Sequence, residues 1–173
     1  MPFARPHLLL LAALVGFLFP DAPGLPAFTV NDCRGKVYTD LDFRARGLVL
    51  VVTAPTYAQG DAQKAWNRAL DPLAWPEDGP YYAFLQDLSQ SWFRGVALAE
   101  MRQRYDPPPL LLVDEDGSVR TALGFPAGAT LVAAYAPGGR LVGVETNGAS
   151  AARAKKLWES VRQPRPAPGR AAP

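Results

Sequence analysis

The sequence predicts an α/β domain, a three-layer sandwich whose mixed central sheet is flanked by helices, with a β-hairpin at its N-terminal end. Three observations carry this prediction. Strongly apolar, β-branched runs such as residues 48–53 alternate with segments of helical period. An antiparallel pair of strands and a last helix follow that alternation. The composition, 49% hydrophobic and 20% charged in 173 residues, is typical of a globular chain and excludes a disordered or collagen-like one.

The first half of the domain is predicted to run hairpin, strand, helix. Residues 28–30 and 36–39 are strand-like, and the segment between them has the composition of a turn. Residues 48–53 indicate a strand buried on both faces, as in parallel sheets. A loop follows to residue 60, and Asp61 is the predicted N-cap of a helix. The apolar face of that helix recurs at helical spacing in Ala62, Ala65, Trp66, Ala69 and Leu70.

The second half is predicted to run strand, helix, strand, short helix, hairpin, helix. Asp114 to Gly117 is expected to be a plain hairpin turn, because a calcium loop needs a Glu six residues after its glycine and residue 123 is Leu. Pro137-Gly138-Gly139 joins the last two strands, and Ser150 caps the last helix. The strand at 81–85, the helix at 96–105, the strand at 110–113 and the short helix at 118–124 come first. The two strands of the hairpin are expected at 131–136 and 140–144.

Residues 1–24 have the pattern of a signal peptide. Arg5 precedes twelve uncharged, apolar residues, Leu8 to Phe19, whereas a membrane-spanning helix needs about 20. Ala22-Pro23-Gly24 offers a cleavage site of small residues. We therefore expect a periplasmic or secreted protein, with an N-terminal membrane anchor facing outside the cytoplasm as the alternative. The folded domain is expected over residues 25–163, followed by a flexible Pro/Arg-rich tail, 164–173.

Charge and composition exclude several classes of function. The formal net charge is +2, and the body of the chain is neutral, whereas nucleic-acid binders carry a basic patch. The chain has one cysteine, Cys33, and one histidine, His7, which lies in the predicted signal peptide. The mature chain therefore lacks the residues for a Ser-His-Asp or Cys-His catalytic unit and for an ordinary zinc site. We expect no metal, no other cofactor and no nucleic-acid partner.

The order of elements resembles the thioredoxin-like fold over residues 28–163, in its peroxiredoxin-type and thiol-disulfide-oxidoreductase branch. The N-terminal hairpin with its Gly35-Lys36 turn, continued through residues 41–44, is similar to that branch. The strand ending in Thr53-Ala54-Pro55 resembles the one that leads to the redox site, and residues 111–117 and 136–142 resemble its later strand and turn elements. The second half also resembles exported proteins of the YtfJ type.

The resemblance implies a redox site that this chain does not complete. The two cysteines of the family's Cys-x-x-Cys motif correspond to Tyr57 and Gly60, and its cis-proline corresponds to Ala129, with Pro126 near enough to leave the alignment open. Disulfide exchange by the family mechanism needs sulfur at those places. The resemblance then implies a binding surface for an extended peptide or an envelope protein. Its residues are Pro55, Thr56, Tyr57, Gly60, Ala129 and Thr130.

Two functions follow from this comparison. The first is a non-catalytic binding or scaffold protein of the cell envelope, which touches the membrane only through an uncleaved N-terminal segment. The second is an atypical single-cysteine thiol oxidoreductase or peroxidase using Cys33. In the first case Tyr57 is expected to be exposed before a helix that begins near Asp61; an inward Tyr57 would make that residue structural.

Overall fold

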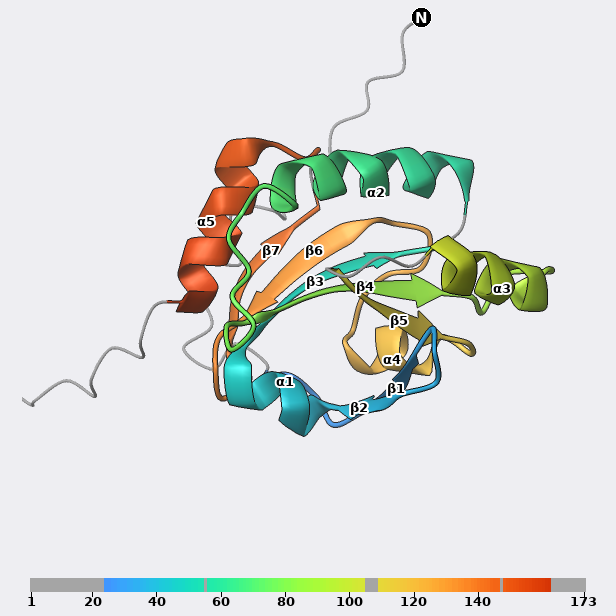
Figure 1. Cartoon of the computed structure of the whole chain (residues 1–173), viewed down its shortest axis with the longest axis horizontal. Coiled ribbons are helices and arrows are strands. Elements are labelled where there is room, and N and C mark those ends of the chain that lie inside the picture. The colour runs from blue at the N-terminus through green and yellow to red at the C-terminus, as the bar shows by residue number, and fades with distance from the viewer. Residues whose placement is uncertain (1–23, 55, 105–108, 147, 163–173) are drawn as a thin grey trace, which may run out of the picture.

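The computed structural model describes residues 24–54, 56–104, 109–146 and 148–162 (Figure 1). The predicted signal peptide up to residue 23 and the predicted tail lie outside these residues. The elements are β1 (Thr29–Asp32), β2 (Val37–Thr39), α1 (Asp40–Arg46), β3 (Leu48–Thr53), α2 (Tyr57–Leu70), β4 (Tyr81–Asp87), α3 (Arg94–Arg104), β5 (Leu110–Asp114), α4 (Ser118–Ala122), β6 (Leu131–Tyr135), β7 (Leu141–Glu145) and α5 (Ala151–Arg162).

The strands form one mixed sheet in the order β2-β1-β5-β4-β3-β6-β7. β3 pairs in parallel with β4, and β4 pairs in parallel with β5. The outer pairs are antiparallel, including the N-terminal hairpin of β1 with β2. β3 lies among the inner strands and is buried along its whole length, as its β-branched pattern predicts. The predicted fold class, with its N-terminal hairpin, is confirmed.

Helices cover both faces of the sheet, because successive side chains of a strand point to opposite sides. On one face, Val49 and Val51 of β3 pack against Trp66 of α2 and Leu157 of α5. On the other face, Leu48, Leu50 and Val52 belong to the cluster that includes Phe43 of α1 and Val119 of α4. α3 covers a smaller cluster near the β1–β2 turn. The three layers of the predicted sandwich are therefore present.

The helix α1 was not expected from the sequence, which placed residues 41–44 in the N-terminal hairpin. The chain instead turns into a helix at Thr39, whose backbone N–H donates to Asp42 Oδ2 at 2.7 Å. Phe43 on this helix is fully buried and stacks with Phe28 and Tyr38. A capping box at Thr39 and Asp42 and one buried aromatic residue therefore decide the local structure.

Both ends of the described domain lie at the sheet edge where β3 begins. The backbone N–H of Leu25 donates to the carbonyl of Gly139, in the turn after β6, at 2.6 Å. At the other end, Val161 of α5 packs beside Gly47, so that a Cβ on Gly47 would lie 2.8 Å from Val161 Cγ1. None of the described helices is long and apolar enough to cross a membrane.

Candidate functional site

The candidate site lies at the opposite end of the inner strands, where β3 ends and β6 begins. We call this place the β3–β6 edge. Residues Thr53 and Thr130 continue the antiparallel pairing of these two strands, and their hydroxyl oxygens are 3.4 Å apart. The strand end at Thr53 and the segment before β6 therefore lie side by side, as the resemblance implies for the expected binding surface. Thr130 is half-buried and Ala129 is exposed. Pro55 lies outside the described residues.

The N-cap of helix α2 lies five residues earlier than predicted. Its N-cap is Thr56 and not Asp61, because Thr56 Oγ1 accepts from the backbone N–H of Gln59 at 3.3 Å. The helix then starts at Tyr57, so positions 57 and 60 both lie in its first turn. This is the place at which a helix N-terminus lowers the pKa of a thiol. The chain has Tyr57 and Gly60 there, and the side chain of Tyr57 lies outside the described part of the structure.

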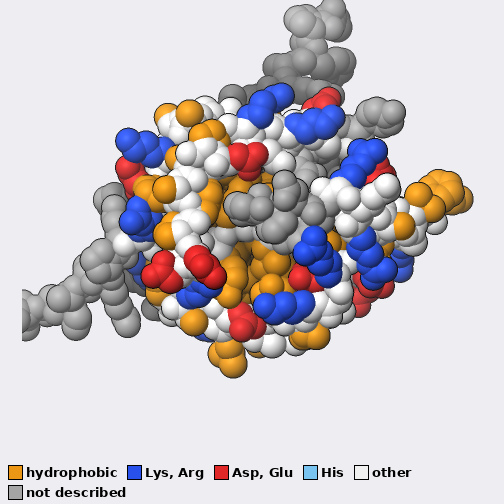
Figure 2. All heavy atoms as spheres, viewed as in Figure 1, with side chains coloured by type: hydrophobic (Ala, Val, Ile, Leu, Met, Phe, Trp, Pro, Cys, Tyr) orange, Lys and Arg blue, Asp and Glu red, His pale blue; other side chains and the backbone are white. Residues whose placement is uncertain are grey.

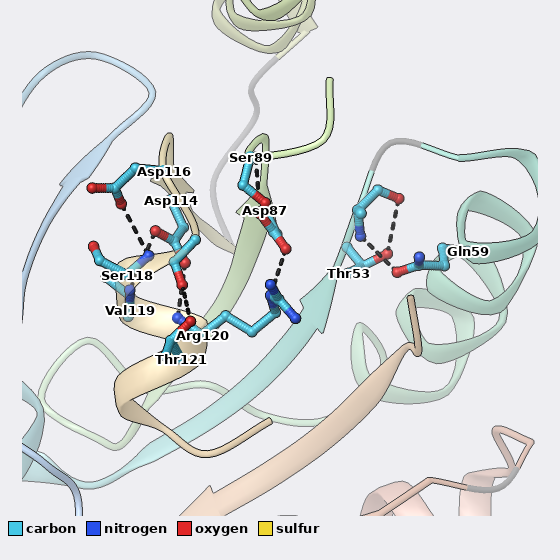
Figure 3. Close-up of polar contacts among 12 residues, drawn as sticks. Thr53, Gln59, Asp87, Ser89, Asp114, Asp116, Ser118, Val119, Arg120 and Thr121 are labelled. Atoms are coloured by element: carbon cyan, nitrogen blue, oxygen red, sulfur yellow. Dashed lines mark hydrogen bonds and ion pairs between the residues drawn. The ribbon is translucent and has the colours of Figure 1, made fainter. Parts of the chain in front are cut away.

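The side chain of Gln59 fixes the loop between β3 and α2. Its Oε1 accepts from the backbone N–H of Ala54 at 2.8 Å, and the residue is buried (Figure 3). Thr56 thus caps the helix, while Gln59 reaches back to the backbone of Ala54, two residues before the N-cap; this resembles a capping box in its spacing of three but not in the N–H that is bound. The sequence carries this signal in Thr56-Tyr57-Ala58-Gln59, which the helical period beginning at Ala62 concealed. The result is a loop tied to its own helix.

Cys33, the chain's single cysteine, is buried away from this loop's helix end. It lies after β1 with 0% of its surface exposed, packed against Leu88 and Val113. Ala97, Leu98 and Met101 of α3 lie over it. Arg102 Nε donates to the carbonyl oxygen of Cys33 at 2.7 Å, which holds α3 to the turn.

The surroundings of Cys33 disfavour its thiolate. Burial raises the pKa of the thiol above its ordinary value, and the charge of Asp32 adds to that effect. The charges of Arg34 and Arg102 act in the opposite direction without cancelling it. Because the thiolate is the reactive form, this arrangement suits a structural cysteine better than a nucleophile. The geometry therefore favours the interpretation of Cys33 as an unreactive residue.

A second polar group lies where β4 and β5 end, and sequence reasoning missed it. Asp87 and Asp114 are neighbours across the two strands. Arg120 Nε of α4 lies 2.5 Å from Asp87 Oδ2, with 13% and 4% of the two side chains exposed (Figure 3). Asp114 accepts from the backbone N–H groups of Val119 and Arg120 at 3.3 and 2.8 Å. The turn predicted after Asp114 is present and leads into the predicted short helix, so it connects β5 to α4 and is not the turn of a hairpin.

The role of this acidic group is to attach α4 to the sheet. Burial raises the pKa of Asp114, although its two backbone hydrogen bonds act in the opposite direction. The carboxylate lies at the N-terminal end of α4, where a helix favours negative charge. Within the described residues, no set of three or more His, Cys, Asp or Glu side chains is arranged to hold a metal ion.

No protein-family model matches the chain, and no curated protein matches its sequence. Solved structures do match. A DsbF homologue from Corynebacterium diphtheriae has a TM-score of 0.64 and 10% identity over 92% of this chain and 99% of its own. MTB DsbF has a TM-score of 0.61 and 17% identity, over 81% of this chain and 98% of its own.

The pneumococcal exposed lipoprotein thioredoxin Etrx1 from Streptococcus pneumoniae has a TM-score of 0.60 and 14% identity, over 77% of this chain and 98% of its own. At such identities the likeness establishes the fold alone. It agrees with the order of strands and with the helices on both faces of the sheet. The chain therefore has a thioredoxin-like fold.

Proposed function

We propose that this is an exported thioredoxin-like protein of the cell envelope that binds an extended polypeptide at the β3–β6 edge and does not exchange disulfides. One observation carries the proposal. The first turn of α2 has Tyr57 and Gly60 where thiol chemistry needs sulfur, while the chain's single thiol, Cys33, is buried under α3. The chain thus has the fold of a thiol-disulfide oxidoreductase, but no cysteine stands in the first turn of α2.

Two observations support a location outside the cytoplasm. The residues before the domain, with Arg5 and the apolar run Leu8–Phe19, have the pattern of a signal peptide. Among the similar structures, Etrx1 is an exposed lipoprotein, and a Mycobacterium tuberculosis disulfide oxidoreductase of the same fold is secreted.

The β3–β6 edge supports binding of an extended chain. The ladder between β3 and β6 ends at Val52 and Leu131, so Ala129 and Thr130 continue the strand direction beyond it. Such a segment can bond to the backbone of a peptide laid along it, and we propose Tyr57, the first residue of α2, as an aromatic contact for that peptide. The Gln59 bond to Ala54 holds the neighbouring loop ready for this ligand.

The first test measures disulfide chemistry. The protein is incubated with insulin and dithiothreitol, and turbidity from the reduced insulin chains is compared with a protein-free control and with a Cys33→Ser variant. We expect all three rates to agree. Turnover that disappears in Cys33→Ser would overturn the proposal and support a single-cysteine oxidoreductase.

The second test measures binding, with reduced and carboxymethylated α-lactalbumin as an unfolded polypeptide. We expect Tyr57→Ala and Thr130→Asp to weaken binding, whereas Leu41→Ala, an exposed substitution on α1, leaves it unchanged. Equal affinity of the two site variants and the wild type would contradict a binding role for this edge.

A further inference from the structure

The connection between β4 and α3 carries an apolar tip that the domain leaves uncovered. Trp92 is 94% exposed and Phe93 is 72% exposed, immediately before α3, and Val96 in its first turn is 65% exposed. We call these three residues the aromatic tip. In Figure 2 a hydrophobic group stands out from the right edge of the molecule, on the side where α3 lies in Figure 1. A contiguous exposed apolar surface of this kind marks an interaction site.

The charged groups of α3 give this region a positive character within a neutral domain. The helix carries Arg94, Arg102 and Arg104 against one acid, Glu100, which pairs with Arg104 at 3.0 Å. Arg94 donates to the carbonyl of Ser89, and Arg102 donates to that of Cys33. Within the described residues, the two side chains are thus held by carbonyl oxygens, whereas Arg104 is held by a carboxylate. Arg94 therefore adjoins the aromatic tip directly, and Arg102 lies about two turns further along α3.

We propose that the aromatic tip and the basic residues of α3 dock the protein reversibly on an anionic phospholipid surface. Trp and Phe side chains favour the boundary between lipid headgroups and acyl chains. Arginines beside them attract anionic headgroups, each contributing about 1 kcal/mol near such a surface. The shape favours a bilayer over a polypeptide, since a protruding tip enters a soft layer, whereas a bound peptide needs a groove or a sheet edge.

The proposal goes beyond peptide binding at the β3–β6 edge, and it rests on the exported, released form of the proposed function. Both ends of the described domain lie at the edge where β3 begins, beside Gly139 and Gly47. The aromatic tip follows β4 at the opposite edge. An anchor at the N-terminal end would hold the tip away from its own membrane, so docking belongs to the processed chain.

The test uses the protein as recovered from the exporting cell, with its intact mass measured first. It is mixed with vesicles of phosphatidylcholine alone or of an equal mixture with phosphatidylglycerol, whose acyl chains carry bromine. Bromine quenches a tryptophan that enters the acyl region. We expect quenching on the anionic vesicles alone, and loss of that signal in Trp92→Phe. Trp66 is buried in the core, and the indole N–H groups of Trp75 and Trp158 donate to the carbonyls of Leu70 and Ala74 within the domain. Added salt should reverse the effect by screening the arginines.

Substitutions then separate the contributions to binding. We expect Trp92→Ala with Phe93→Ala to lower partitioning onto anionic vesicles at least about tenfold, from the loss of apolar contact. Arg94→Gln should lower it severalfold and weaken the salt dependence. The matched control is Leu41→Ala, which removes a 69% exposed apolar side chain from α1 and should change nothing. Equal melting temperatures would show that all the variants are folded.

Four outcomes would overturn the proposal. The first is an unquenched Trp92, and the second is a double variant that partitions like the wild type. The third is binding of carboxymethylated α-lactalbumin that depends on Trp92 while vesicles are ignored, which would assign the tip to a polypeptide. A recovered chain that still begins at Met1 contradicts the release on which docking depends. None of these results changes the insulin test, so docking and the lack of disulfide exchange fail separately.

Discussion

The helices α2 and α3 follow neighbouring parallel strands and begin at the same sheet edge, yet they are held to the domain very differently. α2 buries Trp66 and Leu70 in the core and has a capped start at Thr56. α3 has no buried residue, and only the half-buried Ala97, Leu98 and Met101 pack against the small cluster around Cys33. α2 therefore packs into the main core, whereas α3 covers only the small cluster of Cys33, Leu88 and Val113.

This difference indicates which part of the domain unfolds locally most easily. Segments with few buried apolar contacts open at lower free energy than the core does. α3 therefore opens before α2, and its opening uncovers Cys33. The candidate binding residues show the same division of roles. Gln59 of the well-held α2 fixes the loop after β3, whereas the exposed Trp92 lies just before the loosely held α3.

The largest expected effect is a loss of stability when a core residue of α2 is truncated, compared with a truncation on α3. Trp66→Ala should lower the free energy of unfolding by about 3–5 kcal/mol, because it removes a buried aromatic side chain and leaves a cavity. Val96→Ala on α3 should change it by less than about 0.5 kcal/mol, since that side chain is mostly in water. Urea denaturation followed by circular dichroism measures both. Equal losses would show that α3 is as firmly packed as α2.

The next effect concerns the start of α2. Thr56→Ala should lower the free energy of unfolding by about 1 kcal/mol, because the Gln59 N–H loses its acceptor. Thr56→Ser keeps the hydroxyl and should retain most of the stability. The same urea titration measures both variants. A Thr56→Ala variant as stable as the wild type would mean that the cap does not hold the helix end.

One glycine in each helix allows the stabilities of α2 and α3 to be changed separately. Gly60 in α2 and Gly95 in α3 both have space for a methyl group, and neither has a positive φ. Each Gly→Ala change should raise the free energy of unfolding by about 0.4–1 kcal/mol. Only Gly95→Ala should also slow the labelling of Cys33 by a thiol reagent, by about two- to fivefold, because it stabilises the helix that covers the thiol.

The labelling rate distinguishes two ways of reaching Cys33. If Gly60→Ala slows labelling as much as Gly95→Ala does, the thiol is uncovered only when the whole domain unfolds. That result would contradict a separately opening α3. Labelling at low reagent concentration, compared with unfolding in urea, provides the measurement.

The smallest effect is the pH dependence due to Cys33. Because burial raises the pKa of this thiol in the folded protein, the unfolded chain loses its proton first as the pH rises. Stability from this group is therefore complete below pH 9.0, the ordinary pKa, and declines as the pH rises through the folded value. Urea titrations at about pH 8 and about pH 10 should show this decline. In Cys33→Ala the slope should be smaller; an unchanged slope would assign it to other groups.

The sequence predicts the elements that carry a clear period. β3 follows from its unbroken β-branched run, and α5 from apolar residues spaced three and four apart after Ser150. α1 was missed because its seven residues are too short for a period, although Thr39 and Asp42 carried a capping signal. The start of α2 was displaced to Asp61 for a related reason, since the capping signal at Thr56 precedes the periodic residues.

The polar contacts of the site were less predictable. The approach of Thr53 to Thr130 follows from the pairing of two strands far apart in the chain, and the resemblance to known folds anticipated it. The ion pair of Asp87 with Arg120 has no local signal, because it depends on how α4 packs against the sheet. The burial of Cys33 likewise depends on α3, whose pattern does not reveal which surface it covers.

The position of the two ends has a consequence for how the chain can be rewired. Because the backbone enters beside Gly139 and leaves beside Gly47, a short linker can join the ends into a ring without crossing the β3–β6 edge. New ends opened just before α3 would then fall in an exposed connection that holds no core residue between Gln90 and Phe93. Such a circular permutant keeps the order of the sheet and makes α3 the first element of the chain.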